Sequence, residues 1–269
     1  VVDSFYAGED IFADKEEIKL QPNQYVMLVS NSNDKKTALA RFYNYNDPLV
    51  KMYKMDDVWG IDARNKEQSF ALELLMDPDV EVVSLIGQAG SGKTLLAVAA
   101  GLEQVLGEEQ EYKKLIVSRP IQPLGKDIGF LPGTLEEKMD PWLMPIKDNL
   151  EFLLGNDRDT VKTYFEKGVI EIEAITYIRG RSITNAFIII DEAQNLTRHE
   201  LKTILTRVGE GTKIILTGDI EQIDNIYIDE TSNGLTYAVE KFKEYDISGH
   251  ITLQKGERSK VATLAAKIL

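Results

Sequence analysis

Residues 87–94 read GQAGSGKT, between the apolar run VVSLI at 82–86 and the segment LLAVAA at 95–100. The spacing matches G-x-x-x-x-G-K-[ST] between a strand and a helix, which is the context that this phosphate-binding loop requires. Glycines let backbone N–H groups turn toward phosphate oxygens, and the next helix points its positive end at them. The stretch therefore predicts a nucleoside triphosphate site.

The loop and the first turn of its helix supply the expected nucleotide contacts. Lys93 should reach the β- and γ-phosphate oxygens, and Thr94 should bind Mg²⁺. We expect ATP to be held by Gly87, Gln88, Ala89, Gly90, Ser91, Gly92, Lys93, Thr94 and Leu95.

Four more apolar runs follow the loop, and they predict a parallel sheet. Such runs suit strands that are buried on both faces, with helices between them. The runs are LIVS at 115–118, FIII at 187–190, IILT at 214–217 and ITL at 251–253. With 82–86 they predict an α/β domain with a five-stranded parallel sheet, and nucleotide at the carboxyl ends of the strands.

The stretch FIIIDEAQN at 187–195 places two acids at the end of a predicted strand. Asp191 is positioned to hold Mg²⁺ through water, and Glu192 to orient and deprotonate the attacking water. Acids also favour the first turn of a helix without any catalytic role. The phosphate-binding loop upstream favours the catalytic interpretation, and Glu192 indicates hydrolysis rather than binding alone.

The stretch ILTGDIEQID at 215–224 places Thr217 and Asp219 at the end of another predicted strand. A polar group there can contact the γ-phosphate, and Gln222 could couple the nucleotide to a second surface. The alternative is a simple Gly-Asp turn with no role in binding.

Asn65 and Gln68 open a predicted helix just before the first strand of the sheet. A glutamine amide both donates and accepts hydrogen bonds, so Gln68 can read the edge of adenine. Asn at the N-cap with Gln three residues later is also a capping pair. The residues themselves leave both interpretations open.

Three loop arginines are candidates for a cation that offsets charge in the transition state. Arg258 follows the last predicted strand in GERS, whereas Arg179 and Arg181 precede the FIIIDE strand in RGRS. Any one of them could also be a solvated surface residue.

A Gly/Pro-rich insertion follows the second predicted strand, and residues 125–142 are expected to form an exposed loop. Its aromatic and apolar side chains suit contact with a partner strand or subunit, or packing on one another. These side chains are Phe130, Leu131 and Trp142.

Residues 1–63 differ in pattern from the rest and predict a small β-rich appendage, with 64–269 as the nucleotide-binding domain. Segments 24–30 and 37–45 have strand-like content and are separated by a polar turn. Tyr43 and Tyr45 lie near lysines and could stack on bases. A half-buried strand pair explains the same residues.

The formal net charge of −13 counts against a large nucleic-acid surface, because phosphates are neutralised by lysine and arginine. A polynucleotide would have to bind in a local groove. The chain has no cysteine, which excludes disulfides and thiolate metal sites. Its two histidines, His199 and His250, lack zinc-ligand spacing.

The chain has no run of about 18 apolar residues that would span a membrane. Its acidic first twenty residues lack a signal-peptide pattern, so we expect a cytoplasmic protein. Because it begins with Val1, we also expect that a preceding segment has been removed.

Together these motifs resemble the PhoH family of P-loop ATPases. The resemblance covers 65–269 in the family's order: GQAGSGKTLLA, SRPI, GFLPGTLEEKMDPW, RGRS, FIIIDEAQN, TGDIEQID and GERS. It implies a RecA-like P-loop NTPase core with strand order 5-1-4-3-2, use of ATP and Mg²⁺, oligomeric rings and RNA-directed activity. By position, Gln68 resembles the family's adenine-reading glutamine, and Arg258 resembles its finger arginine.

The segment NKEQSFAL and the β-rich residues 1–63 resemble the longer branch of this family, in which a PIN nuclease domain precedes the PhoH domain. A PIN nuclease needs a cluster of acids on its own α/β domain. Nothing upstream of Asn65 supplies that cluster, so no ribonuclease activity is assigned to this chain.

The leading functional expectation is ATP hydrolysis coupled to binding, remodelling or unwinding of single-stranded RNA. Motors related to this family hold nucleic acid between two RecA-like cores, and this chain has room for one. We therefore expect a homo-oligomeric ring, such as a hexamer, with ATP at or near subunit borders. The alternatives are an NTP-driven switch or scaffold that gates a protein partner, and a small-molecule phosphotransferase.

Overall fold

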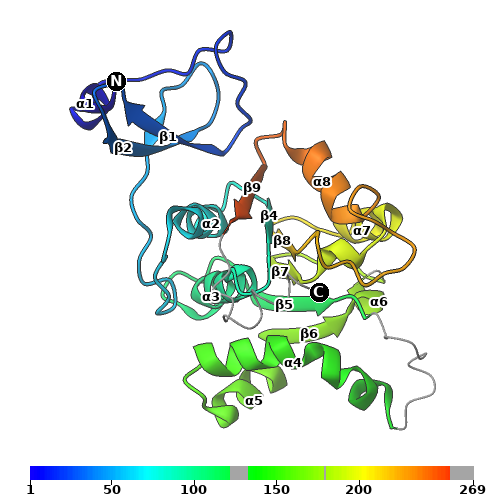
Figure 1. The fold of residues 1–269 in the computed structure, drawn as a ribbon. Coiled ribbons are helices and arrows are strands. Elements are labelled where there is room, and N and C mark those ends of the chain that lie inside the picture. The colour runs from blue at the N-terminus through cyan, green and yellow to red at the C-terminus, as the bar shows by residue number, and fades with distance from the viewer. Residues whose placement is uncertain (122–132, 179, 255–269) are drawn as a thin grey trace, which may run out of the picture.

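The computed structural model describes residues 1–121, 133–178 and 180–254, and its main feature is a parallel sheet (Figure 1). The six strands of this sheet lie in the order β6-β5-β7-β8-β4-β9, and every neighbouring pair is parallel. They are β4 (Val82–Gly87), β5 (Lys114–Arg119), β6 (Ile170–Ala174), β7 (Ala186–Ile190), β8 (Lys213–Gly218) and β9 (Ser248–Leu253).

The RecA-like strand order is confirmed for the five expected strands, which run β9-β4-β8-β7-β5. The expected number of strands was too low, because β6 adds a sixth strand beside β5. Its sequence, IEIEA, alternates isoleucine with glutamate, which is the pattern of an edge strand rather than of a strand buried on both faces.

Helices cover both faces of the sheet, and alternate residues of each strand supply the two cores. In β7, Phe187 and Ile189 belong to one core, whereas Ile188 and Ile190 belong to the other. The first face carries α2 (Lys66–Met76), α3 (Lys93–Leu106), α4 (Leu135–Leu153) and α5 (Arg158–Glu166), and the second carries α6 (Ile175–Ile178), η2 (Ala193–Asn195), α7 (Arg198–Leu205) and α8 (Gly234–Phe242).

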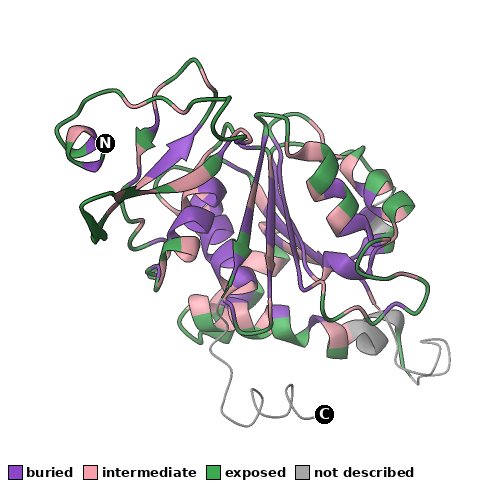
Figure 2. Cartoon of the chain, turned by 45° about the horizontal axis from the view of Figure 1, so that its top comes forward, coloured by how far each residue is buried: buried purple, intermediate pink, exposed green. Residues whose placement is uncertain are grey.

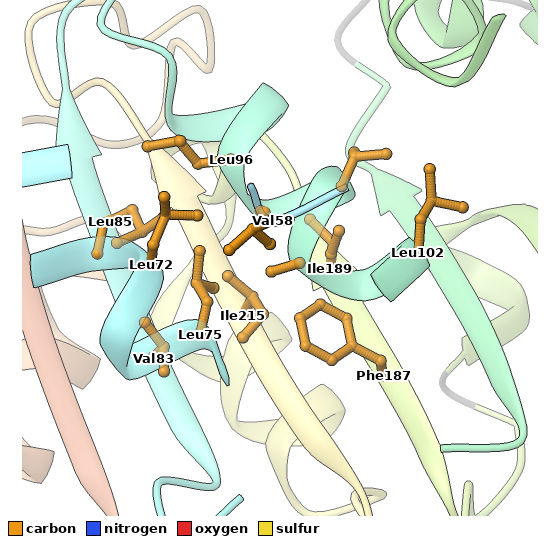
Figure 3. Close-up of a cluster of buried hydrophobic side chains, with 14 of the residues drawn as sticks. Val58, Leu72, Leu75, Val83, Leu85, Leu96, Leu102, Phe187, Ile189 and Ile215 are labelled. Carbon is orange, nitrogen blue, oxygen red and sulfur yellow. The ribbon is translucent and has the colours of Figure 1, made fainter. Parts of the chain in front are cut away.

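The first core fixes α2 and α3 on the strands that carry the nucleotide motifs. Figure 3 shows Leu72 and Leu75 of α2 and Leu96 of α3 directed toward Leu85 and Ile215 of the sheet. Burying a side chain of this size contributes about 1.5–3 kcal/mol. The buried residues, purple in Figure 2, follow the strands and the inner helix faces. This packing holds the strand ends in a fixed register.

Residues 135–153 correct one expectation from the sequence. The predicted exposed loop reached residue 142, but the chain is helical from Leu135, and Trp142 lies within α4. The helix contains Pro141 and Pro145, which remove two backbone donors without ending it. Phe130 and Leu131 lie outside the described residues.

The first sixty residues form a separate small sheet. Helix α1 (Val2–Tyr6) packs on an antiparallel sheet of β1 (Gln24–Ser30), β2 (Asn33–Phe42) and β3 (Val50–Lys51), with its own apolar cluster. Tyr45 is used inside this module: its hydroxyl donates to Ile18 O at 2.9 Å and accepts from Leu20 N at 2.7 Å. This favours the half-buried strand pair over a base-stacking surface. The division at residue 63 stays a prediction.

A buried arginine joins this small sheet to α2. Arg41 of β2 has a side chain that is 3% exposed, and its Nη2 lies 2.8 Å from Asp77 Oδ2 at the end of α2. Arg41 Nη1 lies 3.3 Å from Glu73 Oε1, and Nη2 also donates to Asn23 Oδ1 at 2.8 Å. Asn23 in turn donates to the backbone of Ser248, where β9 begins. The module is thus fixed to α2 and β9 by polar contacts.

Candidate nucleotide site

The loop between β4 and α3 has the backbone conformation of a phosphate cradle. Gly92 has φ 88° and Gly90 has φ 80°, in the left-handed region that favours glycine. Gly87 has no room for a side chain, because a Cβ there would lie 2.6 Å from Ser91 Oγ. Lys93 begins α3, is 6% exposed, and donates to Gln88 O at 3.4 Å. The Lys93 ammonium thus points back to the backbone of the phosphate-binding loop.

Two hydroxyls and a carboxylate meet next to this loop. Thr94 Oγ1 donates to Asp191 Oδ1 at 2.9 Å, and Thr217 Oγ1 donates to the same oxygen at 2.7 Å. These three residues come from α3, the end of β7 and the end of β8, and Asp191 is 2% exposed. Hydroxyl and carboxylate oxygens are the ligands that Mg²⁺ prefers, usually completed by water and phosphate. Thr94 and Asp191, the two residues predicted to bind Mg²⁺, thus lie within hydrogen-bond distance of each other.

Glu192 lies beside Asp191 in a strained backbone conformation. Its φ is 55° and ψ 38°, which is uncommon for a residue other than glycine. Burial, with a smaller contribution from the charge of Asp191, raises the pKa of Glu192 above its usual range. A general base is most effective when its pKa lies near the operating pH, and a raised pKa brings the Glu192 carboxyl group closer to that value. Backbone strain of this kind clusters at functional sites.

Gln194 ties the two acids to the loop after β8. Its Nε2 donates both to Glu192 Oε2 and to Gln222 O, the latter at 3.0 Å. Its Oε1 accepts from Asp219 N at 3.2 Å. The fully buried amide therefore connects the end of β7 with the backbone of Asp219, a predicted γ-phosphate sensor, and of Gln222. No local pattern distinguished Gln194 from its neighbours in FIIIDEAQN.

Arg119, at the end of β5, is a site residue that the sequence reasoning missed. Its Nη2 lies 3.5 Å from Glu192 Oε1 and its Nε lies 3.9 Å from Asp191 Oδ2. Its Nη1 donates to Trp142 O of α4 at 3.2 Å. The signal was available, because Arg119 follows a buried strand as Asp191 does. The sequence did not indicate that its side chain extends toward the acids that follow the neighbouring strand β7.

A pocket of about 910 Å³ opens beside the loop on the side of α2 and α4. Lys93 and Thr94 line it together with Gln68 of α2 and with Asn149 and Phe152 of α4. Its size lies within the range of small-molecule sites. The pocket offers an exposed aromatic ring and an amide for a base, next to the cradle for the phosphates.

Gln68 contacts the phosphate-binding loop directly. Its Nε2 donates to Ser91 O at 3.1 Å, and its Oε1 accepts from Arg64 N at 2.9 Å. Asn65 Oδ1 accepts from Gln68 N at 2.9 Å, so Asn65 is the N-cap of α2. The capping interpretation is thus confirmed, and the amide of Gln68 reaches the phosphate-binding loop. The adenine-reading interpretation stays a prediction.

The residues present fit an anionic ligand with a divalent cation. Among the described residues, three buried side-chain polar atoms lack a hydrogen-bond partner, and two of them lie here: Ser91 Oγ and Asp219 Oδ2. Buried polar atoms are normally paired, so unpaired ones at a site are consistent with a ligand that pairs them. The oxygen ligands around Asp191 match Mg²⁺, and the loop matches a polyphosphate.

The structure brings together most of the predicted site residues that it describes, but not Arg181. Lys93, Thr94, Asp191, Glu192 and Asp219 lie at the carboxyl ends of β4, β7 and β8, as expected. Arg181 instead pairs with Glu173 Oε1 at 2.8 Å and Glu171 Oε2 at 2.9 Å on the edge strand β6. Arg258 and Arg179 lie outside the described residues.

Solved helicase structures resemble this chain in part. The Pif1 helicase from Candida albicans gives a TM-score of 0.36 at 15% identity, covering 77% of this chain and 43% of that one. The helicase MrfA bound to DNA gives a TM-score of 0.44 at 11% identity, covering 89% of this chain and 31% of that one.

Curated relatives are much closer in sequence. Protein PhoH2 of Bacillus subtilis is 51% identical over 99% of this chain and 61% of its own length. Protein PhoH2 of Thermobispora bispora is 40% identical over 83% of this chain and 51% of its own length. The chain thus spans about half to three-fifths of the length of these relatives. A family model described as PhoH-like protein matches residues 60–268, and the chain belongs to this PhoH family.

Proposed function

We propose that this chain hydrolyses ATP with Mg²⁺. The observation that carries the proposal is the convergence of Thr94 and Thr217 on Asp191 Oδ1, at 2.9 and 2.7 Å, beside Lys93 and Glu192. A hydroxyl from the phosphate-binding loop and an acid from another strand meet where a magnesium-bound triphosphate requires both.

In this proposal each residue has a separate task. Lys93 binds the β- and γ-phosphate oxygens, and Thr94 and Asp191 hold Mg²⁺, which would offset charge on those oxygens. Glu192 orients a water molecule and takes its proton as the water oxygen bonds to the γ-phosphorus. The bond from that phosphorus to the β,γ-bridging oxygen breaks, which leaves ADP and phosphate. Gln68 binds adenine, and Asp219 senses the γ-phosphate.

We also propose that hydrolysis is coupled to binding, remodelling or unwinding of single-stranded RNA by a homo-oligomer. Family membership supports this coupling, and a single sheet supplies one nucleotide-binding core per chain. Arg258 is proposed as the finger arginine, acting on the ATP of its own subunit or of a neighbour. The names of the curated relatives state no substrate.

A second candidate is an NTP-driven switch or scaffold that gates a protein partner. The net charge of −13 favours it, since a polynucleotide must bind against an overall negative field. Both candidates use the same nucleotide site, and they differ in what stimulates it.

Phosphate release distinguishes the two candidates. ATP hydrolysis by the 269-residue chain is measured with single-stranded RNA, with single-stranded DNA and without polynucleotide, each over a series of salt concentrations. Stimulation by RNA that declines steeply with salt supports the RNA-coupled ATPase. Hydrolysis indifferent to any polynucleotide supports the switch. The Glu192→Gln variant, measured in parallel, gives the background that does not come from this site.

A further inference from the structure

The loop between β8 and α8 exposes two apolar side chains. Ile226 is 87% exposed and Tyr227 is 85% exposed. Single exposed apolar residues are common, but two adjacent ones at a loop tip present a continuous apolar surface to solvent. Exposed acids flank this tip on both sides: Asp224 precedes it, and Asp229 and Glu230 follow it.

The tip is held by a buried scaffold. Asn225 is 7% exposed, and its Nδ2 donates to Asn195 O at 3.1 Å. Asn195 Oδ1 accepts from Asp224 N at 2.8 Å, and Asn225 Oδ1 accepts from Tyr227 N at 3.0 Å. Anchors that are rigid before binding lose less conformational entropy when they bind. The tip is therefore a preformed projection rather than an unstructured loop.

A groove of about 280 Å³ lies between α7 and α8. These two helices cover the face of the sheet opposite α2 and α3 (Figure 1). Leu205, Tyr237 and Phe242 give it an apolar lining, whereas Arg198, Lys202 and Lys241 make it basic. None of its described lining residues is an aspartate or a glutamate. The groove is therefore a local patch of positive charge on a chain whose net charge is −13.

The cations of the groove are organised around an aromatic ring. The guanidinium of Arg198 lies 4.5 Å from the centre of the Tyr237 ring, and Lys241 Nζ lies 5.6 Å from it. Arg198 Nη2 also donates to Thr231 O, in the loop that carries the tip, at 3.2 Å. The tip and the groove therefore lie near each other on one flank of the molecule.

We propose that the Ile226–Tyr227 tip of one copy of this chain docks into the α7–α8 groove of a second copy. The tip is apolar with an acidic surround, and the groove is apolar with a basic surround, so the two surfaces match in both polarity and charge. Because the tip and the groove are different surfaces, each copy can insert its tip into the groove of the next, and such a head-to-tail contact can close a ring. This inference rests on the self-association in the proposed function, for which it names the two contact surfaces. The proposed ATP hydrolysis does not require this contact.

Disulfide trapping tests the contact in a chain that contains no cysteine of its own. Chains carrying Tyr227→Cys are mixed with chains carrying Thr206→Cys, a groove-lining position, and oxidised with copper–phenanthroline in air. The expected result is a heterodimer that reducing agent separates. The control mixes Tyr227→Cys with Lys162→Cys, an exposed position on α5. Equal cross-linking in both mixtures overturns the proposal.

Self-association in solution provides the second measurement. Sedimentation of the wild-type chain should give a mass above that of the monomer. The double change Ile226→Ser and Tyr227→Ser should raise the dissociation constant by about 30-fold or more, the effect of losing an interface hot spot. Tyr53→Ser removes a ring that is 72% exposed elsewhere and should leave the mass unchanged. A monomeric wild-type chain overturns the contact, and its ATPase activity then shows whether the proposed reaction survives.

Charge reversal separates a second copy from RNA as the occupant of the groove. Lys202→Glu with Lys241→Glu should weaken self-association, and Asp229→Lys with Glu230→Lys in the partner chain should restore part of it. If the groove variant instead loses binding of a single-stranded RNA oligonucleotide while its mass and cross-linking stay at wild-type levels, the groove binds RNA and the proposal is wrong.

Discussion

The two ends of helix α2 lie in buried polar clusters that are built differently. At its C-terminal end, Arg41 is paired with Glu73 and Asp77, and Lys213 Nζ donates to Leu74 O and Asp77 O, both at 2.6 Å. At its N-terminal end, Gln68 touches the phosphate-binding loop, where Ser91 Oγ is buried without a partner.

The difference separates a structural network from the proposed nucleotide site. The junction cluster places opposite charges together, and in the described part of the chain Arg41 Nε is its one buried side-chain polar atom without a hydrogen-bond partner. The proposed nucleotide site at the carboxyl ends of β4, β7 and β8, called the edge below, places Asp191 and Glu192 side by side. The backbone of Glu192 is strained there, and Asp219 Oδ2 is buried without a hydrogen-bond partner. Changes at the junction should therefore affect stability, and changes at the edge should affect turnover.

The largest expected effect is on turnover at the edge. Glu192→Gln keeps the shape and the hydrogen bond from Gln194 but cannot take a proton. ATP hydrolysis should fall by about 10²–10⁴-fold, the usual contribution of a general base, while ATP affinity is retained. Steady-state phosphate release and equilibrium binding of a fluorescent ATP analogue measure the two quantities. Equal losses of binding and turnover would contradict the assigned role.

A change at the junction should give the opposite result. Arg41→Met leaves Glu73 and Asp77 without their cation, and should lower the free energy of unfolding by about 3 kcal/mol. This is the low end for breaking a buried pair, because both acids keep partial access to solvent. Urea denaturation measures the loss, and ATP turnover of the folded variant should stay within about threefold of wild type. An equally stable variant with impaired turnover would remove the distinction between the two clusters.

Arg119 tests how the edge balances its charge before the metal binds. Arg119→Ala removes a cation from beside Asp191 and Glu192, so Mg²⁺ should bind more readily. The Mg²⁺ concentration that gives half-maximal hydrolysis should fall by roughly 3- to 10-fold, because like charges no longer repel in a partly screened site. Arg119→Lys keeps the charge and serves as the matched control. An unchanged Mg²⁺ requirement in Arg119→Ala would show that the guanidinium does not act on the metal site.

The smallest effect concerns His250, which lies on β9 near the junction. Burial lowers the pKa of His250 from 6.5 to about 4, and its ring nitrogens lie 2.8 Å from Ser84 Oγ and 3.0 Å from Thr252 Oγ1. The stability that depends on the neutral ring is thus fully present above about pH 6.5 and is lost as the pH falls toward 4.

His250→Asn should therefore reduce the loss of stability between pH 7 and pH 5 by about 1 kcal/mol. Urea denaturation of both proteins at the two pH values gives the difference, in which contributions from other groups largely cancel. A variant that loses as much stability as wild type would exclude His250 as a source of the pH dependence.

The sequence predicted those parts of the molecule that depend on local patterns of residues. The phosphate-binding loop, the buried strands and the N-cap at Asn65 each depend on neighbouring residues, and each is present. The strand order followed from the family resemblance. Strand β6 was missed because Glu171 and Glu173 interrupt its apolar pattern, and both pair with Arg181 at the sheet edge.

The contacts that the sequence could not predict join distant segments. Arg119 meets Glu192 across two parallel strands, and Arg41 meets Asp77 between the small sheet and α2. Nothing in the local sequence specifies which acid a given arginine will reach. The helix that contains Trp142 was missed for a different reason, since the Gly/Pro-rich composition of 125–142, which includes Pro141, suggested a loop.

Hydrolysis of ATP by the wild-type chain and by Lys93→Ala, with Mg²⁺ present, tests the central claim most directly. If the ammonium of Lys93 binds the triphosphate at the edge formed by Thr94, Asp191 and Glu192, the wild-type chain releases phosphate and the variant falls to the rate without enzyme. A Lys93→Ala chain that remains folded and hydrolyses ATP at the wild-type rate would contradict the assignment of this edge as the nucleotide site.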